Sequence, residues 1–532
     1  MDEKQLPGTT VVPVASAVDL DVKIKTIAEK TKKMTEEDLT IREALKKYPM
    51  ALFWALFMAL GIVMTGYDQA LISTFYALPS FAKKYGQPDG DGGYEITAAW
   101  QTGLSMGSPI GQVLGPLLCS WPMEKWGRKN TMIFSCILVT GFNFIQFFAK
   151  NIGTICVGEM IAGVVWGVFV ALSPTYAAEI APLPLRPIVS SISNLAFVIG
   201  QFTAQGVQAG CQNMTTQWSY RIPFAVQWAW PAIILAGIFW CPESPWWLVR
   251  QNRISDAKIS LTKLGWDTEE GSQTDELIEL MKETNDLEQE VEAAASYAEC
   301  FKKVSIRRTE ICVGVFCAQV LVGNWYVSYL TYFFELAGLT TKNAFDLAVG
   351  VNAIGFTMTL LSWPLMRYVG RRPIFLFGCA GLGVVLIIMG GLDSAPNYLK
   401  DSGLRWGEAV MMVFWQAIYQ ITIGPLTFVI LGEIPSTRLK SRVIALSLAS
   451  SSLCGIAFGA GLPYMFADGW RGKTGFLFGG LSFILTVWTY FRLPETANKS
   501  FQEIDILFER GVSARHFASF DVTKLDEETA SI

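Results

Sequence analysis

The chain has 532 residues and a formal net charge of −4; 51% of its residues are hydrophobic and only 17% are charged. Soluble proteins carry about 25% charged residues, so this composition excludes an ordinary set of soluble domains and favours a membrane protein. The small net charge also argues against nucleic acid as a partner.

The residue types used by metal sites and by histidine-based catalysis are scarce. The ten cysteines include no C-x-x-C pair, and the single histidine, His516, lies in a polar segment near the C-terminus. Most of the cysteines fall in apolar runs, where a thiol behaves as a small hydrophobic side chain. We therefore expect no metal, no cofactor and no enzymatic activity.

Apolar stretches recur along the chain, each close to the roughly 20 residues needed to cross a bilayer. In chain order they are 50–76, 97–120, 131–149, 153–176, 189–210, 221–241, 311–334, 344–366, 373–392, 406–431, 442–466 and 474–492. This pattern predicts an all-α membrane protein with twelve transmembrane helices in two six-helix bundles. The predicted parts are a disordered tail (1–48), a first bundle (49–241), a charged linker with helices (242–310), a second bundle (311–493) and a second tail (494–532).

The distribution of Lys and Arg predicts the side of the membrane that each loop faces. An even number of spans places both termini and the linker on one side. That side carries, among other basic residues, Arg42, Lys46, Arg250, Lys302, Arg307 and Arg308. Because positively charged loops stay in the cytoplasm, both termini are predicted to be cytoplasmic. The sequon at Asn213 would then be an external glycosylation site.

Two short basic loops occupy equivalent places in the two halves. They read MEKWGRKN (123–130) and MRYVGRRP (366–373), while Glu179 and Glu433 end spans 4 and 10. The basic side chains can pair with these acids and latch the cytoplasmic side, although charges that only set the topology would give the same pattern. The predicted latch residues are Glu124, Arg128, Glu179, Arg186, Arg371, Glu433 and Arg438.

Two further motifs follow the last span of each half. PESPWWLVR (242–250) and PETANKSFQEID (494–505) resemble the paired signatures of the sugar porter family of the major facilitator superfamily. Three other segments (296–311, 433–442 and 472–496) resemble the fungal α-glucoside, or maltose-type, permeases. The resemblance covers roughly residues 45–510. It implies the major facilitator fold, alternating access and a sugar as the transported molecule.

Ionisable residues inside a span are costly, so they are candidates for function. Asp68 lies toward the outer end of span 1 and Glu159 near the outer start of span 4. Two nearby acids in a poorly hydrated site favour a proton on one of them at ordinary external pH. In sugar porters the matching Asp is the proton-linked residue, and a Glu on span 4 is a trait of the α-glucoside symporters. We therefore predict that Asp68 and Glu159 couple transport to protons, although structural hydrogen bonding by Asp68 and solvent exposure of Glu159 remain alternatives.

Sugars are bound by hydrogen-bonding side chains and by aromatic faces. Asn194 and Gln201, seven residues apart on span 5, share a helix face and match polar sugar contacts of the family. Each amide could instead be a contact between helices. The complete predicted substrate site is Asn194, Gln201, Gln319, Asn324, Trp325, Tyr329, Asn352 and Phe428, of which the last lies just after the Gly424-Pro425 helix break predicted in span 10.

The sequence therefore predicts a secondary active transporter that imports a sugar, such as maltose, by proton symport. A hexose uniporter and an exporter of a fungal secondary metabolite remain alternatives, and a sensor built on a transporter fold is less favoured because the C-terminal tail is short. We expect a monomer in contact with membrane lipids, as a multi-pass protein of the plasma membrane with the proton gradient as its energy source.

Overall fold

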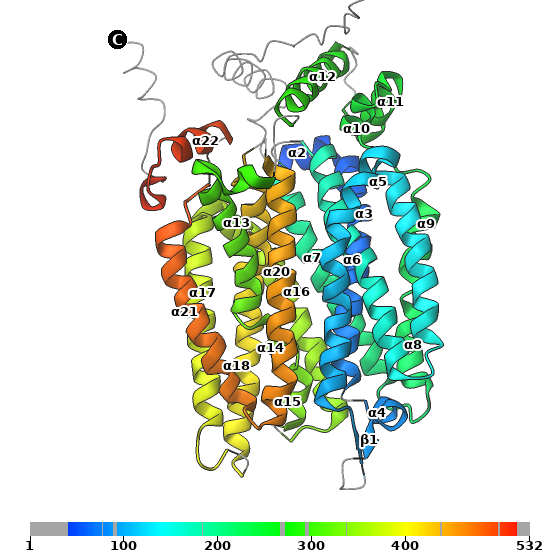
Figure 1. The fold of residues 1–532 in the computed structure, drawn as a ribbon, viewed down its shortest axis with the longest axis vertical. Helices are drawn as coiled ribbons and strands as arrows, with labels where there is room; N and C mark the ends of the chain where they lie inside the picture. The colour runs from blue at the N-terminus through cyan, green and yellow to red at the C-terminus, as the bar shows by residue number, and fades with distance from the viewer. Residues whose placement is uncertain are drawn as a thin grey trace, which may run out of the picture.

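The computed structural model describes residues 41–518 apart from 77, 89–92, 183–184, 267–271, 293–296, 337, 399, 437–438, 498 and 500. Residues 1–40 of the first predicted tail and 519–532 of the second therefore lie outside the described residues. The described part is mostly helical, and its long helices run side by side along one axis (Figure 1).

The first half of the chain begins with the short helix α2 (Ile41–Lys47). Its long helices are α3 (Pro49–Phe75), α5 (Ala98–Phe147), α6 (Ile152–Ile180) and α7 (Arg186–Cys211). Two shorter helices, α8 (Trp218–Val226) and α9 (Ala229–Gly237), follow one another along the predicted span 6. Helix α5 contains one non-helical residue, Gly127, so it joins two of the predicted spans across a kink.

Three helices of the linker lie beyond one end of the long helices: α10 (Pro245–Arg250), α11 (Ile254–Leu264) and α12 (Ser272–Glu292) (Figure 1). We call this the linker end. Helix α4 (Pro79–Tyr85) and the antiparallel strands β1 (Gln87–Pro88) and β2 (Tyr94–Glu95) lie at the opposite end, which we call the hairpin end.

In the second half, the described residues form ten α-helices of unequal length. They are α13 (Lys303–Leu321), α14 (Asn324–Val327), α15 (Leu330–Leu336), α16 (Thr341–Val369), α17 (Arg371–Asp393), α18 (Ser402–Ile421), α19 (Ile423–Glu433), α20 (Lys440–Ala467), α21 (Thr474–Arg492) and α22 (Phe501–Glu509). Short 3₁₀ turns complete this half at Tyr297–Phe301, Arg471–Lys473 and Ala514–His516.

Nine helical segments in the described part of the chain are long and apolar enough to cross a membrane. One of them is α5, whose 50 residues cover two predicted spans. The predicted spans 189–210 and 221–241 fall on α7 and on the pair α8 and α9, which are not among the nine. The all-α fold is confirmed, while the number of twelve transmembrane helices stays a prediction.

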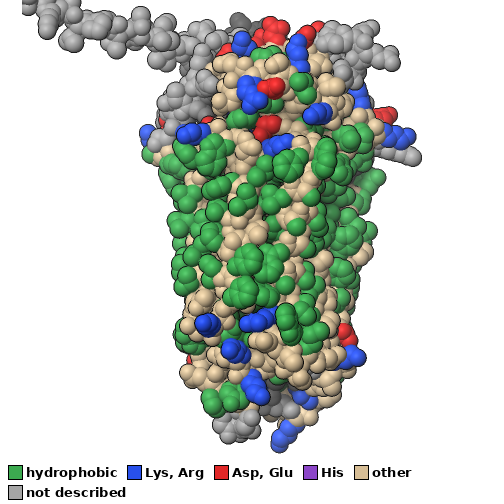
Figure 2. All heavy atoms as spheres, turned by 90° about the vertical axis from the view of Figure 1, so that its right-hand side faces the viewer, with side chains coloured by type: hydrophobic (Ala, Val, Ile, Leu, Met, Phe, Trp, Pro, Cys, Tyr) green, Lys and Arg blue, Asp and Glu red, His purple; other side chains and the backbone are tan. Residues whose placement is uncertain are grey.

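The surface and the cores have the distribution expected of a membrane protein. Apolar side chains cover the middle of the face in Figure 2, and charged side chains gather toward its two ends. Large side chains such as Phe239, Tyr368, Phe377 and Ile484 are more than half exposed, as lipid-facing residues would be. Separate buried apolar clusters fill each half, and a smaller one lies under the linker helices.

Candidate functional site

Close packing of small residues brings the helices of the first half together around two acidic side chains. A Cβ on Gly107 of α5 would lie 2.8 Å from the Cβ of Glu159 on α6. A Cβ on Gly66 of α3 would lie 2.5 Å from the carbonyl oxygen of Phe197 on α7. Glycine thus allows the close helix approach that larger residues would prevent. Glu159 is held directly in one of these contacts, and Asp68 follows Gly66 by two residues.

Asp68 and Glu159 form a pair inside the first bundle. Both are fully buried, and their carboxyl groups interact with each other. Each lies seven residues from the hairpin-end terminus of its helix, about 10 Å along the axis at ~1.5 Å per residue. Asp68 Oδ2 and Glu159 Oε2 have no hydrogen bond of normal geometry from another described group, and the Trp166 side chain also interacts with Asp68. The structure therefore brings together the two acids that the sequence singled out, and places Glu159 away from solvent.

Two buried amides complete the acid pair, and sequence reasoning missed both. Gln227 donates its side-chain N–H to Asp68 Oδ1 at 2.8 Å, and Gln146 donates to Glu159 Oε1 at 2.9 Å. The signal available in the sequence was a glutamine inside an apolar run, because a polar side chain in a span is a candidate for function as an ionisable one is. Their partners could not be read from the sequence because each bond joins different helices.

A second group of polar side chains lies where the two bundles meet. Asn194 on α7 donates to Gln420 Oε1 on α18 at 3.0 Å, and Thr359 on α16 donates to the same oxygen at 3.3 Å. A Cβ on Gly424 would lie 3.0 Å from Asn194 Oδ1, so a larger residue there would crowd the Asn194 amide. Asn194 was predicted, whereas Gln420 and Thr359 were missed. Gln201 lies half-buried further along α7.

The predicted amides of spans 7 and 8 have local partners in this conformation. Gln319 on α13 accepts a hydrogen bond at 3.2 Å from Tyr419, a residue of α18 that was not predicted. Asn352 on α16 donates to the carbonyl of Ala348 in its own helix at 2.9 Å. Gln319 thus belongs to the contact with α18, while one of the two side-chain N–H groups of Asn352 is used within its own helix.

Span 7 is broken in the middle, and three predicted residues follow the break. Gly323 has φ +92°, which ends α13, and Asn324 begins α14 as an exposed residue. Trp325 packs on span 11, because a Cβ on Gly455 of α20 would lie 3.2 Å from its indole nitrogen. Tyr329 is buried and lies beyond α14. The irregular backbone explains how neighbouring residues reach different surfaces.

Phe428 lies among aromatic rings from both bundles. Its ring centroid is 5.5 Å from that of Phe316 on α13 and 6.5 Å from that of Phe197 on α7. The helix break before it falls at Thr422, between α18 and α19, two residues earlier than the predicted Gly424-Pro425 break. Proline is tolerated in the first turn of a helix, so Pro425 follows the break instead of forming it.

Tyrosine and serine hydroxyls connect the bundles toward the hairpin end. Tyr76 bonds Ser105 of α5 at 2.9 Å, and the Tyr329 hydroxyl from the second bundle also interacts with Ser105. Thr102 on α5 donates to the carbonyl of Ala460 on α20 at 3.3 Å. The contacts of Tyr329 with Ser105 and of Thr102 with Ala460 join the two bundles, whereas the bond between Tyr76 and Ser105 lies within the first bundle.

Ion pairs join the basic loops to the helix ends at the linker end. Arg128 pairs with Glu179 at 2.6 Å, and Arg371 pairs with Glu433 at 3.0 Å. Glu124 is exposed, and its main-chain carbonyl accepts a bond from Trp247. The side chain of Arg186 and the whole of Arg438 lie outside the described residues. The pairs are present in both halves, while their role as a latch stays a prediction.

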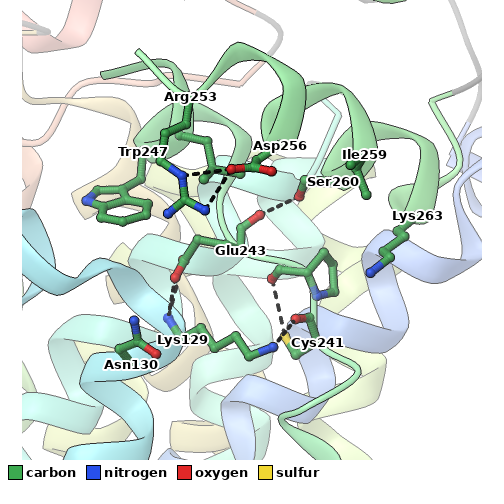
Figure 3. A pocket seen from close by; sticks show the side chains of 12 residues that line it. Lys129, Asn130, Cys241, Glu243, Trp247, Arg253, Asp256, Ile259, Ser260 and Lys263 are labelled. Atoms are coloured by element: carbon green, nitrogen blue, oxygen red, sulfur yellow. Dashed lines mark hydrogen bonds and ion pairs between the residues drawn. The ribbon is translucent and has the colours of Figure 1, made fainter. Parts of the chain in front are cut away.

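The acids of the Pro-Glu motifs cap the helices that follow the basic loops. Glu243 accepts main-chain N–H bonds from Arg128 at 3.0 Å and from Lys129, and Glu495 accepts one from Arg371 at 3.0 Å. Figure 3 shows Glu243 between Lys129 and Ser260. The Ser260 hydroxyl donates to the main-chain carbonyl of Glu243. Burial raises the pKa of Glu243, while the main-chain donors act against that shift. Sequence reasoning used these motifs only as family signatures and missed this contact.

We expect Gly127→Ala to lower the thermal stability of the purified protein. Gly127 has φ 86° and ψ 176°, a region essentially limited to glycine, where another residue costs about 1–3 kcal/mol. The added Cβ would also lie 2.5 Å from Glu243 Oε2. The matched control is Gly141→Ala in the same helix, where a Cβ would meet nothing within 4 Å. Equal melting temperatures for the two variants would contradict the assigned capping geometry.

A third buried acid, Glu408, was also missed although it lies within the predicted span 406–431. It is 1% exposed and accepts hydrogen bonds from Tyr326 of α14 at 3.3 Å and from Tyr398. Burial raises the pKa of Tyr398, which keeps its hydroxyl protonated and able to donate. Glu408 therefore ties the broken span 7 to α18 and to the loop at the hairpin end.

Two remaining expectations concern sites outside the bundles' interior. Asn213 is exposed in the turn between α7 and α8, where a glycan could be attached, but its modification stays a prediction. Within the described residues there is no group of three or more His, Cys, Asp or Glu side chains that could hold a metal ion.

Comparison with known sequences relates this chain to a large group of membrane transporters. The family described as "Sugar (and other) transporter" matches residues 54–508. A general alpha-glucoside permease of Saccharomyces cerevisiae is 37% identical over 492 residues, which cover 91% of this chain and 79% of the permease. A maltose permease of the same species is 34% identical over 506 residues, covering 93% and 81% of the two chains.

Comparison with solved structures identifies the same fold. The proton:xylose symporter XylE bound to 6-bromo-6-deoxy-D-glucose has a TM-score of 0.71 and 20% sequence identity, covering 87% of this chain and all of the symporter. XylE of E. coli in an inward-open conformation has a TM-score of 0.68. At this level of identity the likeness establishes the major facilitator fold.

Proposed function

This chain belongs to the sugar (and other) transporter family, and on that premise we propose that it imports an α-glucoside, such as maltose, by proton symport. Relatives whose names specify α-glucosides or maltose support the substrate class, because they are 34–37% identical over more than nine-tenths of this chain. The buried pair of Asp68 and Glu159 carries the proton-coupling part of the proposal.

The acid pair suits reversible proton binding. Two charged carboxylates in contact within the membrane would repel each other strongly, so one proton held between them stabilises the pair. A proton can arrive from the hairpin end, which lies about 10 Å away along α3 at ~1.5 Å per residue. We therefore take the hairpin end as external and the linker end as cytoplasmic, which also places both termini in the cytoplasm.

The transport cycle follows from the contacts at the two ends. With the hairpin-end contacts of Thr102 with Ala460 and of Ser105 with Tyr329 open, a proton binds at Asp68 and Glu159, and a sugar exchanges its hydroxyls for the bond between Asn194 and Gln420. Closure of the hairpin end and separation of the Arg128–Glu179 and Arg371–Glu433 pairs then open the opposite side. The sugar leaves, and the proton follows.

The same proposal assigns a place and partners to the protein. We infer a multi-pass protein of the plasma membrane that acts as a monomer, in contact with lipid through its apolar belt, with Asn213 glycosylated outside. Its partner in function is the sugar, and the proton gradient supplies the energy.

The test is extracellular alkalinisation by transporter-null yeast cells that express the chain, on addition of maltose. Proton uptake that requires maltose and is lost with a protonophore is the expected result. Glucose uptake without alkalinisation would instead identify a hexose uniporter. Surface-located protein with no maltose uptake would overturn the α-glucoside assignment and favour the exporter.

A further inference from the structure

We propose that Gln227 and Gln146 are positioning residues for proton coupling. Each amide holds one oxygen of its acid, Asp68 Oδ1 or Glu159 Oε1, which we call the outer oxygens. The two remaining oxygens, Asp68 Oδ2 and Glu159 Oε2, are the inner oxygens, which face each other and share a single proton. The inference rests on the proposed function, since it concerns the site assigned there to the proton. It adds two uncharged residues that set how tightly the proton is held.

The four side chains form a continuous line across the first bundle. Gln227 Nε2 lies 2.8 Å from Asp68 Oδ1, and Gln146 Nε2 lies 2.9 Å from Glu159 Oε1. The carboxyl groups interact with each other, and neither Asp68 Oδ2 nor Glu159 Oε2 has a hydrogen bond of normal geometry from another described group, although the Trp166 side chain also interacts with Asp68. The two acids therefore meet through these inner oxygens, because the outer oxygens are already occupied by the amides.

The fold fixes the position of each amide. Gln227 lies at the junction of α8 and α9, where its main-chain N–H bonds Phe224 three residues back and the helix tightens locally. Such an irregular turn inside a helix often marks a functional position. The next residue, Trp228, anchors the junction by donating to the carbonyl of Thr140 at 3.2 Å. Gln227 is fully buried, so its side chain has no freedom to turn toward solvent.

Gln146 is held equally firmly at the end of α5. Its side chain passes over Gly158 of α6, where a Cβ would lie 2.9 Å from Gln146 Cγ. Gln146 is 2% exposed. A side chain at position 158 would displace the amide from Glu159, which is the next residue along α6.

The chemistry of an amide suits this role better than that of a cation. An amide N–H stabilises a carboxylate by hydrogen bonding but adds no charge, so the pair still needs its proton. The other titratable side chains that interact with the pair are Tyr67, Tyr76 and Cys156. These are neutral at physiological pH, since their ordinary pKa values are about 10 for tyrosine and about 8.5 for cysteine. The two amides, with the Trp166 side chain beside Asp68, are thus the uncharged donors that adjust the balance between the charged and the protonated pair.

Another buried amide shows what a structural role looks like in the same bundle. Gln208 on α7 is fully buried and donates at 3.3 Å to the carbonyl of Leu71, a main-chain group. Like Gln227, it has an Oε1 without a donor among the described residues. Gln208→Leu therefore removes a comparable buried amide without touching a carboxyl group and is the matched control for Gln227→Leu.

The experiment has two readouts, one made in cells and the other in purified protein. The first is maltose uptake as a function of external pH. The second is the pH dependence of covalent labelling of Asp68 and Glu159 by dicyclohexylcarbodiimide, which adds to a protonated carboxyl and needs no sugar. Without the amide the charged form loses a donor and the proton is held more tightly. We expect Gln227→Leu and Gln146→Leu to move both midpoints to higher pH by at least ~0.5 units, whereas Gln208→Leu keeps those of the unaltered chain.

The outcomes separate this proposal from the proposed function. Labelling midpoints that move in the two variants, in a chain without maltose-driven proton uptake, would uphold the positioning role and reject α-glucoside symport. Unmoved midpoints in both variants, with normal symport by the unaltered chain, would overturn the positioning role alone. If Gln227→Leu does not reach the membrane, Gln227→Met serves in its place, because its unbranched side chain fills the same space without a donor.

Discussion

Replacing Asp68 with Asn is expected to abolish accumulation of sugar against its gradient while leaving exchange of sugar across the membrane. Asparagine cannot bind and release the coupling proton, but it keeps the size of the side chain and can still face Gln227 and Glu159. A membrane potential of ~100 mV is worth ~2.3 kcal/mol per proton, which corresponds to about a 50-fold accumulation at 1.36 kcal/mol per tenfold. The ratio of internal to external maltose at steady state should therefore fall by this factor in the variant.

The control for this variant is Asp346→Asn. Asp346 is exposed near the start of α16, so the same change there removes a carboxylate outside the buried pair. It should keep both accumulation and alkalinisation. Glu159→Gln is expected to lie between the two, because Asp68 remains able to take a proton. Accumulation by Asp68→Asn equal to that of the unaltered chain would show that coupling lies elsewhere.

Much of the helical architecture could be predicted, because a bilayer demands long apolar segments and the chain supplies them in order. What the pattern could not show is where a helix breaks or continues. Gly127 has non-helical φ and ψ and forms a kink within α5 between two predicted spans, and spans 6, 7 and 10 break near Gln227, Gly323 and Thr422. These breaks depend on contacts with other helices, such as the packing of Trp228 on α5, which hydropathy does not record.

The residues of the candidate site also fall into those that the sequence could predict and those that only the contacts between helices reveal. Asp68, Glu159 and Asn194 were predicted because their chemistry is unusual in an apolar segment. Gln227 and Gln420 were missed because a neutral amide is a weaker signal, and its importance appears only when the residue across the helix interface is known. The ion pairs at the linker end were expected from their repetition in both halves. The capping role of the Pro-Glu motifs was not expected, because it depends on the approach of Glu243 to the main chain of Arg128 in three dimensions.

Gln420→Leu is expected to raise the KM for maltose by about 10- to 100-fold with little change in surface expression. Gln420 accepts bonds from Asn194 of the first bundle and from Thr359 of the second, so it lies where a sugar held between the bundles would be bound. Leucine fills a similar space but cannot bond a sugar hydroxyl, so that hydroxyl would be left without its partner in the bound state, while Thr359 keeps its bond to the carbonyl of Gly355 at 2.9 Å. Leaving a buried group unsatisfied costs about 1–3 kcal/mol, and each 1.4 kcal/mol is about tenfold in affinity.

The size of this effect depends on the position of the amide between the bundles, and Gln208→Leu tests that dependence. Gln208 is equally buried but bonds a main-chain carbonyl within the first bundle. Its loss should affect stability more than KM. Asn194→Ala should resemble Gln420→Leu, and the double variant should cost less than the sum of the two, because both changes remove the same bond. Strictly additive effects on maltose KM would place the sugar away from this contact and favour the aromatic rings around Phe428 as its binding site.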